Sequence, residues 1–238
     1  MITNVSVKKI SQIVEKKATA EHRYFVHCLV VLFVIWSLYR YLFVGMSVVV
    51  DETIGKLIFF ALPVGLYVVL TQAPLLYAEL SPKVLLKGIF WGAIFGGLLG
   101  FVSTFAVLSG KSQVLIAPTF ISLGFWWQFF LGVLTGFWES VFFFGWVQAT
   151  TKLAFPKWHL VKVLLFANLT FVLFHIPNVL SRFDISWGIE FQTYFFSQLL
   201  LLSAFAVGQG LLFERFRNLY TLTLVHAIWG TILLVFGR

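Results

Sequence analysis

Three side chains of this sequence differ in chemistry from their surroundings: Glu139, His175 and His226. Each lies well inside a long apolar stretch, where a carboxylate or an imidazole is costly unless it is hydrated, neutralised or paired. Such residues are candidates for a functional site, because they contribute little to apolar packing. We therefore expect the three side chains to converge to within about 8 Å of one another.

Two kinds of chemistry suit a carboxylate with two imidazoles. Glu139 could be a general base that takes a proton from water, while the histidines bind a developing oxyanion or protonate a leaving amine. Alternatively, the same three side chains bind a divalent metal, such as zinc, that activates the water. The sequence has no His-Glu-x-x-His motif, no Gly-x-Ser-x-Gly elbow and no phosphate-binding loop. Water activation with or without a metal therefore remains, and serine-based catalysis and nucleotide binding have no support.

The elements that must position these residues are membrane-spanning helices. The chain of 238 residues is 60% hydrophobic and 11% charged, with a mean hydropathy of +0.96. These values exclude a soluble domain, and long apolar runs without alternation exclude a β-barrel. We predict an all-α polytopic transmembrane bundle with a four-helix core that carries the site. It has about seven spans, at residues 24–44, 54–78, 86–108, 120–151, 163–180, 191–213 and 219–236.

The chain divides into three parts on this interpretation. Residues 1–23 form a cytoplasmic or interfacial N-terminal segment, residues 24–118 form the N-terminal transmembrane helices, and residues 119–238 form the core with the site. Lysine and arginine are concentrated in loops on one side, which predicts a multi-pass cell-membrane protein with a cytoplasmic N-terminus. These cations near anionic lipid explain the net charge of +8, so we expect no nucleic-acid partner. Glu52 and Lys56 then fall at the opposite membrane face.

Depth in the membrane is an independent reason to group the three residues. Counted from the flanking cytoplasmic charges at about 1.5 Å per residue, Glu139, His175 and His226 lie roughly 20, 20 and 14 Å deep. They therefore fall in one layer, and we expect no other acidic or histidine side chain deep within a span. Phe171, one turn before His175, is expected to orient the imidazole by ring contact. Asn168 either bonds into the site or bridges two helices.

Glycines recur at every fourth position on one face of the third predicted span: Gly88, Gly92, Gly96 and Gly100. Gly132 and Gly136 repeat this spacing just before Glu139. A stripe of small residues lets two helices approach closely. We expect these glycines to serve helix packing rather than to line a substrate groove.

The order of these motifs resembles the CAAX-protease and bacteriocin-processing family of intramembrane proteases. Its bacterial members are called Abi proteins, and its eukaryotic type is the prenyl-protein endopeptidase. The segment Glu139-Ser-Val-Phe-Phe-Phe-Gly145 is similar to the first family motif, Glu-Glu-x-x-x-Arg followed by Gly. Phe171-Val-Leu-Phe-His175 matches the second motif, and His226-Ala227 resembles the third. The resemblance covers about residues 120–237, and it implies a cytoplasm-facing cavity in which Glu139 activates water.

Three positions depart from the family pattern. Ser140 replaces the second glutamate, Phe144 replaces the arginine, and Gly230 stands where the third motif usually has Asn or Asp. Losing the glutamate and the arginine together is consistent if they normally pair, since neither is left uncompensated. Ser140 and Phe144 are four residues apart on one helix face. We expect apolar packing to replace the pair, with Phe144 filling the volume of the arginine.

Three functions fit these observations. The first is an intramembrane endopeptidase of the CAAX prenyl protease 2-like type, in which water activated by Glu139 attacks a peptide bond of a membrane-anchored peptide or protein. The second is a catalytically impaired family member that acts as an immunity, scaffold or regulatory membrane protein, which the three departures support. The third is a carrier whose polar layer relays protons or metal ions, although the two halves of the chain show no repeat.

Overall fold

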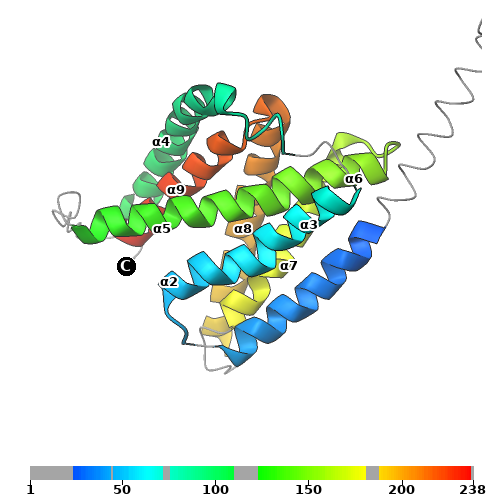
Figure 1. The fold of residues 1–238 in the computed structure, drawn as a ribbon. Coiled ribbons are helices and arrows are strands. Elements are labelled where there is room, and N and C mark those ends of the chain that lie inside the picture. Colours follow the sequence, from blue (N-terminus) through cyan, green and yellow to red (C-terminus); the bar gives the residue numbers. More distant parts are fainter. Residues whose placement is uncertain (1–23, 44, 72–75, 110–122, 181–187, 237–238) are drawn as a thin grey trace, which may run out of the picture. The chain divides into compact units, whose positions relative to one another are not determined.

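The computed structural model describes residues 24–43, 45–71, 76–109, 123–180 and 188–236, and within these ranges it contains helices and no strand (Figure 1). The all-α prediction is confirmed. The predicted N-terminal segment, residues 1–23, lies outside the described residues. The helices in chain order are Tyr24–Leu42, α2 (Val48–Val50), η1 (Asp51–Gly55), η2 (Leu57–Ala61), α3 (Leu62–Thr71), η3 (Pro82–Val84), α4 (Leu85–Ser109), α5 (Leu123–Glu139), η5 (Ser140–Gln148), α6 (Ala149–Ala154), α7 (Leu160–Leu180), α8 (Ile189–Phe216) and α9 (Leu219–Phe236).

Six helical segments in the described part of the chain are long and apolar enough to cross a membrane: Tyr24–Leu42, Asp51–Thr71, Pro82–Phe105, Gly124–Ala154, Leu160–Leu180 and Phe191–Phe216. The seventh expected span corresponds to α9, whose apolar part, Leu219–Ile232, is shorter. Large apolar side chains such as Leu70 and Leu86 are about four-fifths exposed, as lipid-facing positions require. The prediction of a polytopic membrane protein is therefore confirmed.

The second span differs from its prediction at both ends. It was expected at residues 54–78, and the structure has one helical segment at Asp51–Thr71. Its first half is formed by η1 and η2, which are π-helical, and Pro63 follows directly in α3. A proline removes a helix hydrogen bond, and such π-helical turns commonly accompany a distortion of this kind. The earlier start brings Glu52 into the helix that was already expected to contain Lys56.

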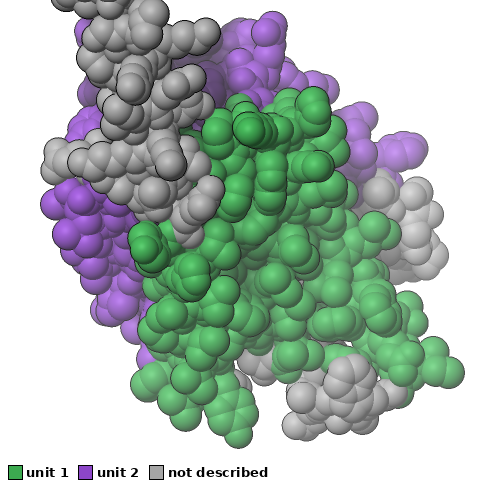
Figure 2. Space-filling view, turned by 90° about the vertical axis from the view of Figure 1, so that its right-hand side faces the viewer, with its two compact units in different colours: residues 1–45, 146–210 green, residues 46–145, 211–238 purple. Residues whose placement is uncertain are grey.

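The chain forms two compact units by its internal contacts, coloured separately in Figure 2. Unit 1 consists of Met1–Gly45 and Trp146–Gly210, and unit 2 of Met46–Gly145 and Leu211–Arg238. Each unit is described by itself below. The functional division at residues 23 and 118 stays a prediction.

In unit 1, polar bonds tie α7 to two other helices. The indole nitrogen of Trp36 donates a hydrogen bond of 2.9 Å to the carbonyl oxygen of Phe174. The Asn168 amide donates one of 2.8 Å to Ser203 Oγ on α8. Of the two roles considered for Asn168, the structure therefore has the bridge between helices.

In unit 2, α9 runs alongside both α4 and α5 (Figure 1). The glycine stripe of α4 faces α9, and a Cβ atom added to Gly92 or Gly96 would lie 2.8 Å from a side-chain atom of Leu224 or Ile228. Contacts this close exclude any larger residue unless the helices move apart. The expectation that the glycines serve helix packing is confirmed, and α9 is held in place by this contact.

Candidate active site

Glu139 lies where the helical geometry of the fourth span changes. It is the last residue of α5, and the following nine residues form the π-helical segment η5. Every residue from Glu139 to Thr151 is buried. On this turn, the rings of Phe142 and Phe143 pack against Phe60 of η2, with centroid distances of 4.7 and 5.5 Å. π-Helical segments are rare in proteins, and those that occur are often found at functional sites. Here one begins directly after the only acidic residue in the sequence of the span.

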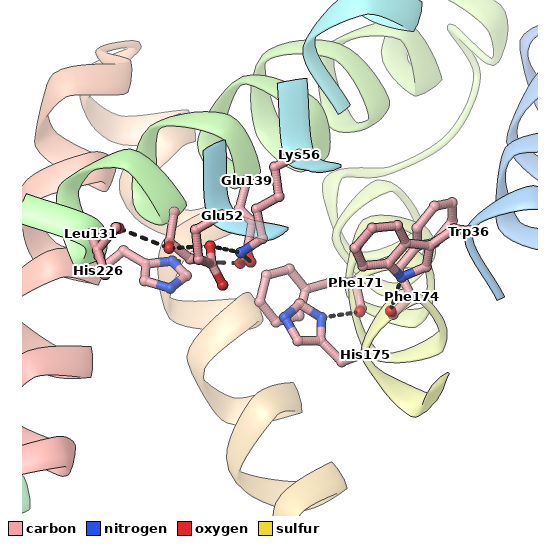
Figure 3. A network of polar contacts seen from close by, with 10 residues as sticks. Trp36, Glu52, Lys56, Leu131, Glu139, Phe171, Phe174, His175 and His226 are labelled. Atoms are coloured by element: carbon pink, nitrogen blue, oxygen red, sulfur yellow. Dashed lines mark hydrogen bonds and ion pairs between the residues drawn. The ribbon is translucent and has the colours of Figure 1, made fainter. Parts of the chain in front are cut away.

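Lys56 forms a buried ion pair with Glu139 (Figure 3). Its Nζ atom lies 2.7 Å from Glu139 Oε1 and 2.7 Å from Glu52 Oε2. Glu52 also accepts a hydrogen bond from the hydroxyl of Thr135, one helical turn before Glu139. The side chains of Lys56 and Glu139 are only 4% and 5% exposed. One ammonium therefore compensates two carboxylates inside unit 2.

The sequence assigned Glu52 and Lys56 to the membrane face opposite the N-terminus, whereas the structure buries Lys56 against Glu139. Sequence reasoning missed Lys56, because a lysine near the start of a span ordinarily reaches the polar headgroups. One signal was present. Glu52 and Lys56 are four residues apart, the spacing at which a glutamate and a lysine pair on one helix face.

His226 is positioned in unit 2 by the contact between α9 and α5. Gly136 lies against it, and a Cβ atom on Gly136 would be 2.9 Å from His226 Cβ and 2.7 Å from the carbonyl oxygen of Thr223. This close approach brings His226 Nδ1 to 3.8 Å from Glu139 Oε2 (Figure 3). The structure therefore brings two of the three expected residues together.

His175 lies in unit 1, on α7. Its ring stacks on Phe171 with a centroid distance of 4.2 Å and an interplanar angle of 26°, so the expected ring contact is present. Its Nδ1 atom lies 2.7 Å from the carbonyl oxygen of Phe171, and because a carbonyl only accepts, Nδ1 carries the proton. This bond fixes the orientation of the ring and leaves Nε2 as the ring nitrogen that can take part in a reaction. Since Glu139 and His226 belong to unit 2, the convergence of all three residues stays a prediction.

The three positions that depart from the family motifs differ in their surroundings. Ser140 and Phe144 are buried, at 1% and 2% exposure, and the neighbouring ring of Phe142 packs against Phe60. That Phe144 fills the volume of the arginine stays a prediction. Gly230 is half-buried, and a Cβ atom added to it would meet no atom within 4 Å among the described residues. Gly230 follows His226 by one turn on the same face of α9. The third departure therefore leaves space, whereas the first two are packed.

Unit 2 by itself supplies two of the three ligands expected for a divalent metal, and the three-ligand site with His175 stays a prediction. Structural and catalytic zinc sites use three or four protein ligands, whereas Glu139 and His226 supply two. The ammonium of Lys56 already lies beside Glu139 Oε1. In the part of the chain that the structure describes, no group of three or more His, Cys, Asp or Glu side chains is arranged to hold a metal ion.

Comparison with protein families gives one match. Residues 120–232 match the family model Rce1-like, described as type II CAAX prenyl endopeptidase Rce1-like. The matched region contains Glu139, His175 and His226, and the resemblance noted from the motifs is confirmed. Among curated proteins and among solved structures, none matches the chain.

Proposed function

Because residues 120–232 belong to the type II CAAX prenyl endopeptidase family, we propose that this protein is an intramembrane endopeptidase that cleaves a membrane-anchored peptide or protein. The observation that carries the proposal is the separation of 3.8 Å between Glu139 Oε2 and His226 Nδ1. Two polar atoms at this separation are too far apart for a strong direct bond, and they can both bind one water molecule. The pair is therefore suited to hold the water that hydrolysis requires.

In the proposed reaction, Glu139 takes one proton from this water through Oε2. The water oxygen then forms a bond to the scissile carbonyl carbon, and His226 donates a hydrogen bond to the oxyanion that develops. Collapse of the tetrahedral intermediate breaks the carbon–nitrogen bond, and the leaving amine takes up a proton. His175 is the proposed donor of that proton, through Nε2 of its imidazolium form, in which the Nδ1–H stays bound to Phe171. The proton that Glu139 took from the water then replaces the one that His175 has given.

The surroundings of the pair support this role. Low exposure of Glu139 limits the number of water molecules, so that electrostatic interactions in the site are strong. The unit 2 residues act through a carboxylate, an imidazole and an ammonium, so the proposal needs no metal. The family resemblance implies a cytoplasm-facing cavity, so the proposal includes access of the substrate from the cytoplasm.

A second candidate function is that of a catalytically impaired family member with a scaffold, immunity or regulatory role. The observation that favours it is the contact between Lys56 and Glu139 Oε1. A carboxylate bound by an ammonium can serve as a structural anchor between two spans, and Ser140, Phe144 and Gly230 have lost the side chains of the family motifs. In this case Glu139 takes no proton from water.

Cleavage of a membrane-tethered peptide by the protein in liposomes separates the two functions. For an endopeptidase, Glu139→Gln lowers kcat by about two to four orders of magnitude, because the amide cannot accept the proton. Glu79→Gln is the matched control, since Glu79 is another buried carboxylate of unit 2, bound to Arg217 at 2.9 Å. Wild-type cleavage by Glu139→Gln would refute the proposed mechanism.

A further inference from the structure

The helical turn after Glu139 has no charged side chain where the family motif places two. Ser140 and Phe144 occupy the positions of the second glutamate and the arginine, and both are buried. The neighbouring rings of Phe142 and Phe143 pack against Phe60, so apolar contacts fill this part of unit 2. A charged pair that supports Glu139 must therefore come from another helix.

Glu52 and Lys56 provide such a pair. They are four residues apart, as are Ser140 and Phe144, and they form an ion pair of 2.7 Å. Lys56 reaches Glu139, and Glu52 accepts a hydrogen bond from Thr135, so the pair is attached to α5 at two points (Figure 3). A glutamate and a cation with the spacing of the missing pair thus contact the helix that lost it.

We propose that Glu52 and Lys56 have taken over the role of the missing glutamate–arginine pair, with Lys56 as a positioning residue for Glu139. The catalytic part of this inference rests on the proposed function. Removing one partner of a buried ion pair leaves an uncompensated charge, so Lys56 keeps Glu139 ionised and able to accept a proton. Lys56 also holds Oε1, which turns Oε2 toward His226 Nδ1. Glu52 binds the same ammonium and fixes its position.

A double-mutant cycle on thermal stability in detergent tests the coupling without any need for activity. Lys56→Met keeps much of the side-chain length, and it leaves Glu52 and Glu139 together without a cation. We expect this variant to have a lower Tm than the wild type. Adding Glu139→Gln to Lys56→Met should raise the Tm again, because one of the two uncompensated carboxylates is removed. A double variant with a lower Tm than Lys56→Met would overturn the inference.

Kinetics of cleavage test the positioning role. Misplacement of a catalytic group by about 1 Å can lower the rate about 100-fold, so we expect Lys56→Met to lower kcat by about 10- to 100-fold with KM little changed. Lys56→Arg should restore most of kcat, because it returns a cation to Glu139. The matched control is Arg217→Met, which breaks the ion pair with buried Glu79 in the same unit. This control should lower the Tm and leave kcat unchanged.

The outcomes separate this inference from the proposed function. If the wild type cleaves and Lys56→Met retains the wild-type kcat, the positioning role is refuted while the endopeptidase stands. If neither the wild type nor any variant cleaves, the proposed function fails and the positioning of a catalytic base fails with it. The double-mutant cycle on thermal stability then still shows whether Lys56 compensates the charge of Glu139.

Discussion

The Cβ atom of His226 lies so close to Gly136 that a methyl group on residue 136 would be 2.9 Å from it. The same methyl group would lie 2.7 Å from a backbone oxygen of α9, at Thr223, which cannot rotate away. Glycine at position 136 therefore sets the distance between α5 and α9. It also sets the distance between Glu139 and His226.

Gly136→Ala should displace α9 and separate His226 from Glu139. We expect kcat for the tethered peptide to fall by about 100-fold and the Tm to fall as well, because the close helix contact is lost. The matched control is Gly97→Ala on α4, where an added Cβ meets no atom within 4 Å among the described residues. The control should keep its activity and gain a little stability from the better helix former. Equal kcat values for the two variants would contradict the role of Gly136.

Gly230→Asn should increase activity. The position has open space for a side chain within the described structure, and it lies one turn after His226. An amide there can donate a hydrogen bond to the oxyanion, and a single donor of this kind contributes about 100- to 1,000-fold in other enzymes. We expect a gain of about tenfold or less, because this chain has not evolved around an amide. Gly230→Ala is the control, since it adds volume without a donor. A similar effect of both substitutions on kcat would show that hydrogen bonding is not responsible.

Phe171→Leu should loosen the ring of His175. The substitution keeps the carbonyl oxygen that accepts the Nδ1–H bond and removes the stacked ring. If His175 protonates the leaving amine, we expect kcat to fall by about tenfold and KM to change little, because proton transfer depends on orientation. Comparison of kcat and KM with those of Leu173→Ala, an exposed residue of the same helix, provides the control.

Chelators should leave the activity largely unchanged. The reason is that Lys56 binds one oxygen of Glu139, and among the described residues of unit 2 a single imidazole lies beside the other oxygen. The measurement is cleavage of the tethered peptide after dialysis against EDTA or phenanthroline, with and without added zinc. Complete inhibition that zinc reverses would establish a metal site and contradict the mechanism proposed here.

Local patterns predicted much of this fold. Long apolar runs give the spans because the hydrocarbon core sets their length, and the four-residue glycine spacing predicted the close contact of α4. The spacing in Phe171-Val-Leu-Phe-His175 likewise placed an aromatic ring on the imidazole. In each case the residues that form the pattern lie within a single helix, so the pattern can be read from the sequence.

Two features could not be predicted in the same way. The π-helical geometry of η5 could not be seen in the sequence, because no polar residue lies between Ser140 and Gln148 to mark the helical period. The burial of Lys56 depends on Glu139, which is 83 residues away. Positive charges near the end of a span are usually a sign of the membrane surface. Only the ion pair with Glu139, on another helix, shows that Lys56 is buried.

That separation of 83 residues also bears on how the protein is made. A ribosome delivers the second span to the translocon well before the fourth, so Lys56 enters the membrane with Glu52 as its nearby counter-charge. The span is then a weak insertion substrate, because a lysine opposes insertion more strongly the deeper it lies. We expect the ion pair with Glu139 to hold the two spans together once both have been inserted. We expect truncated chains that end before the fourth span to insert their second span incompletely, which glycosylation mapping would measure. The ion pair of Lys56 and Glu139 would thus also support the membrane insertion of the second span.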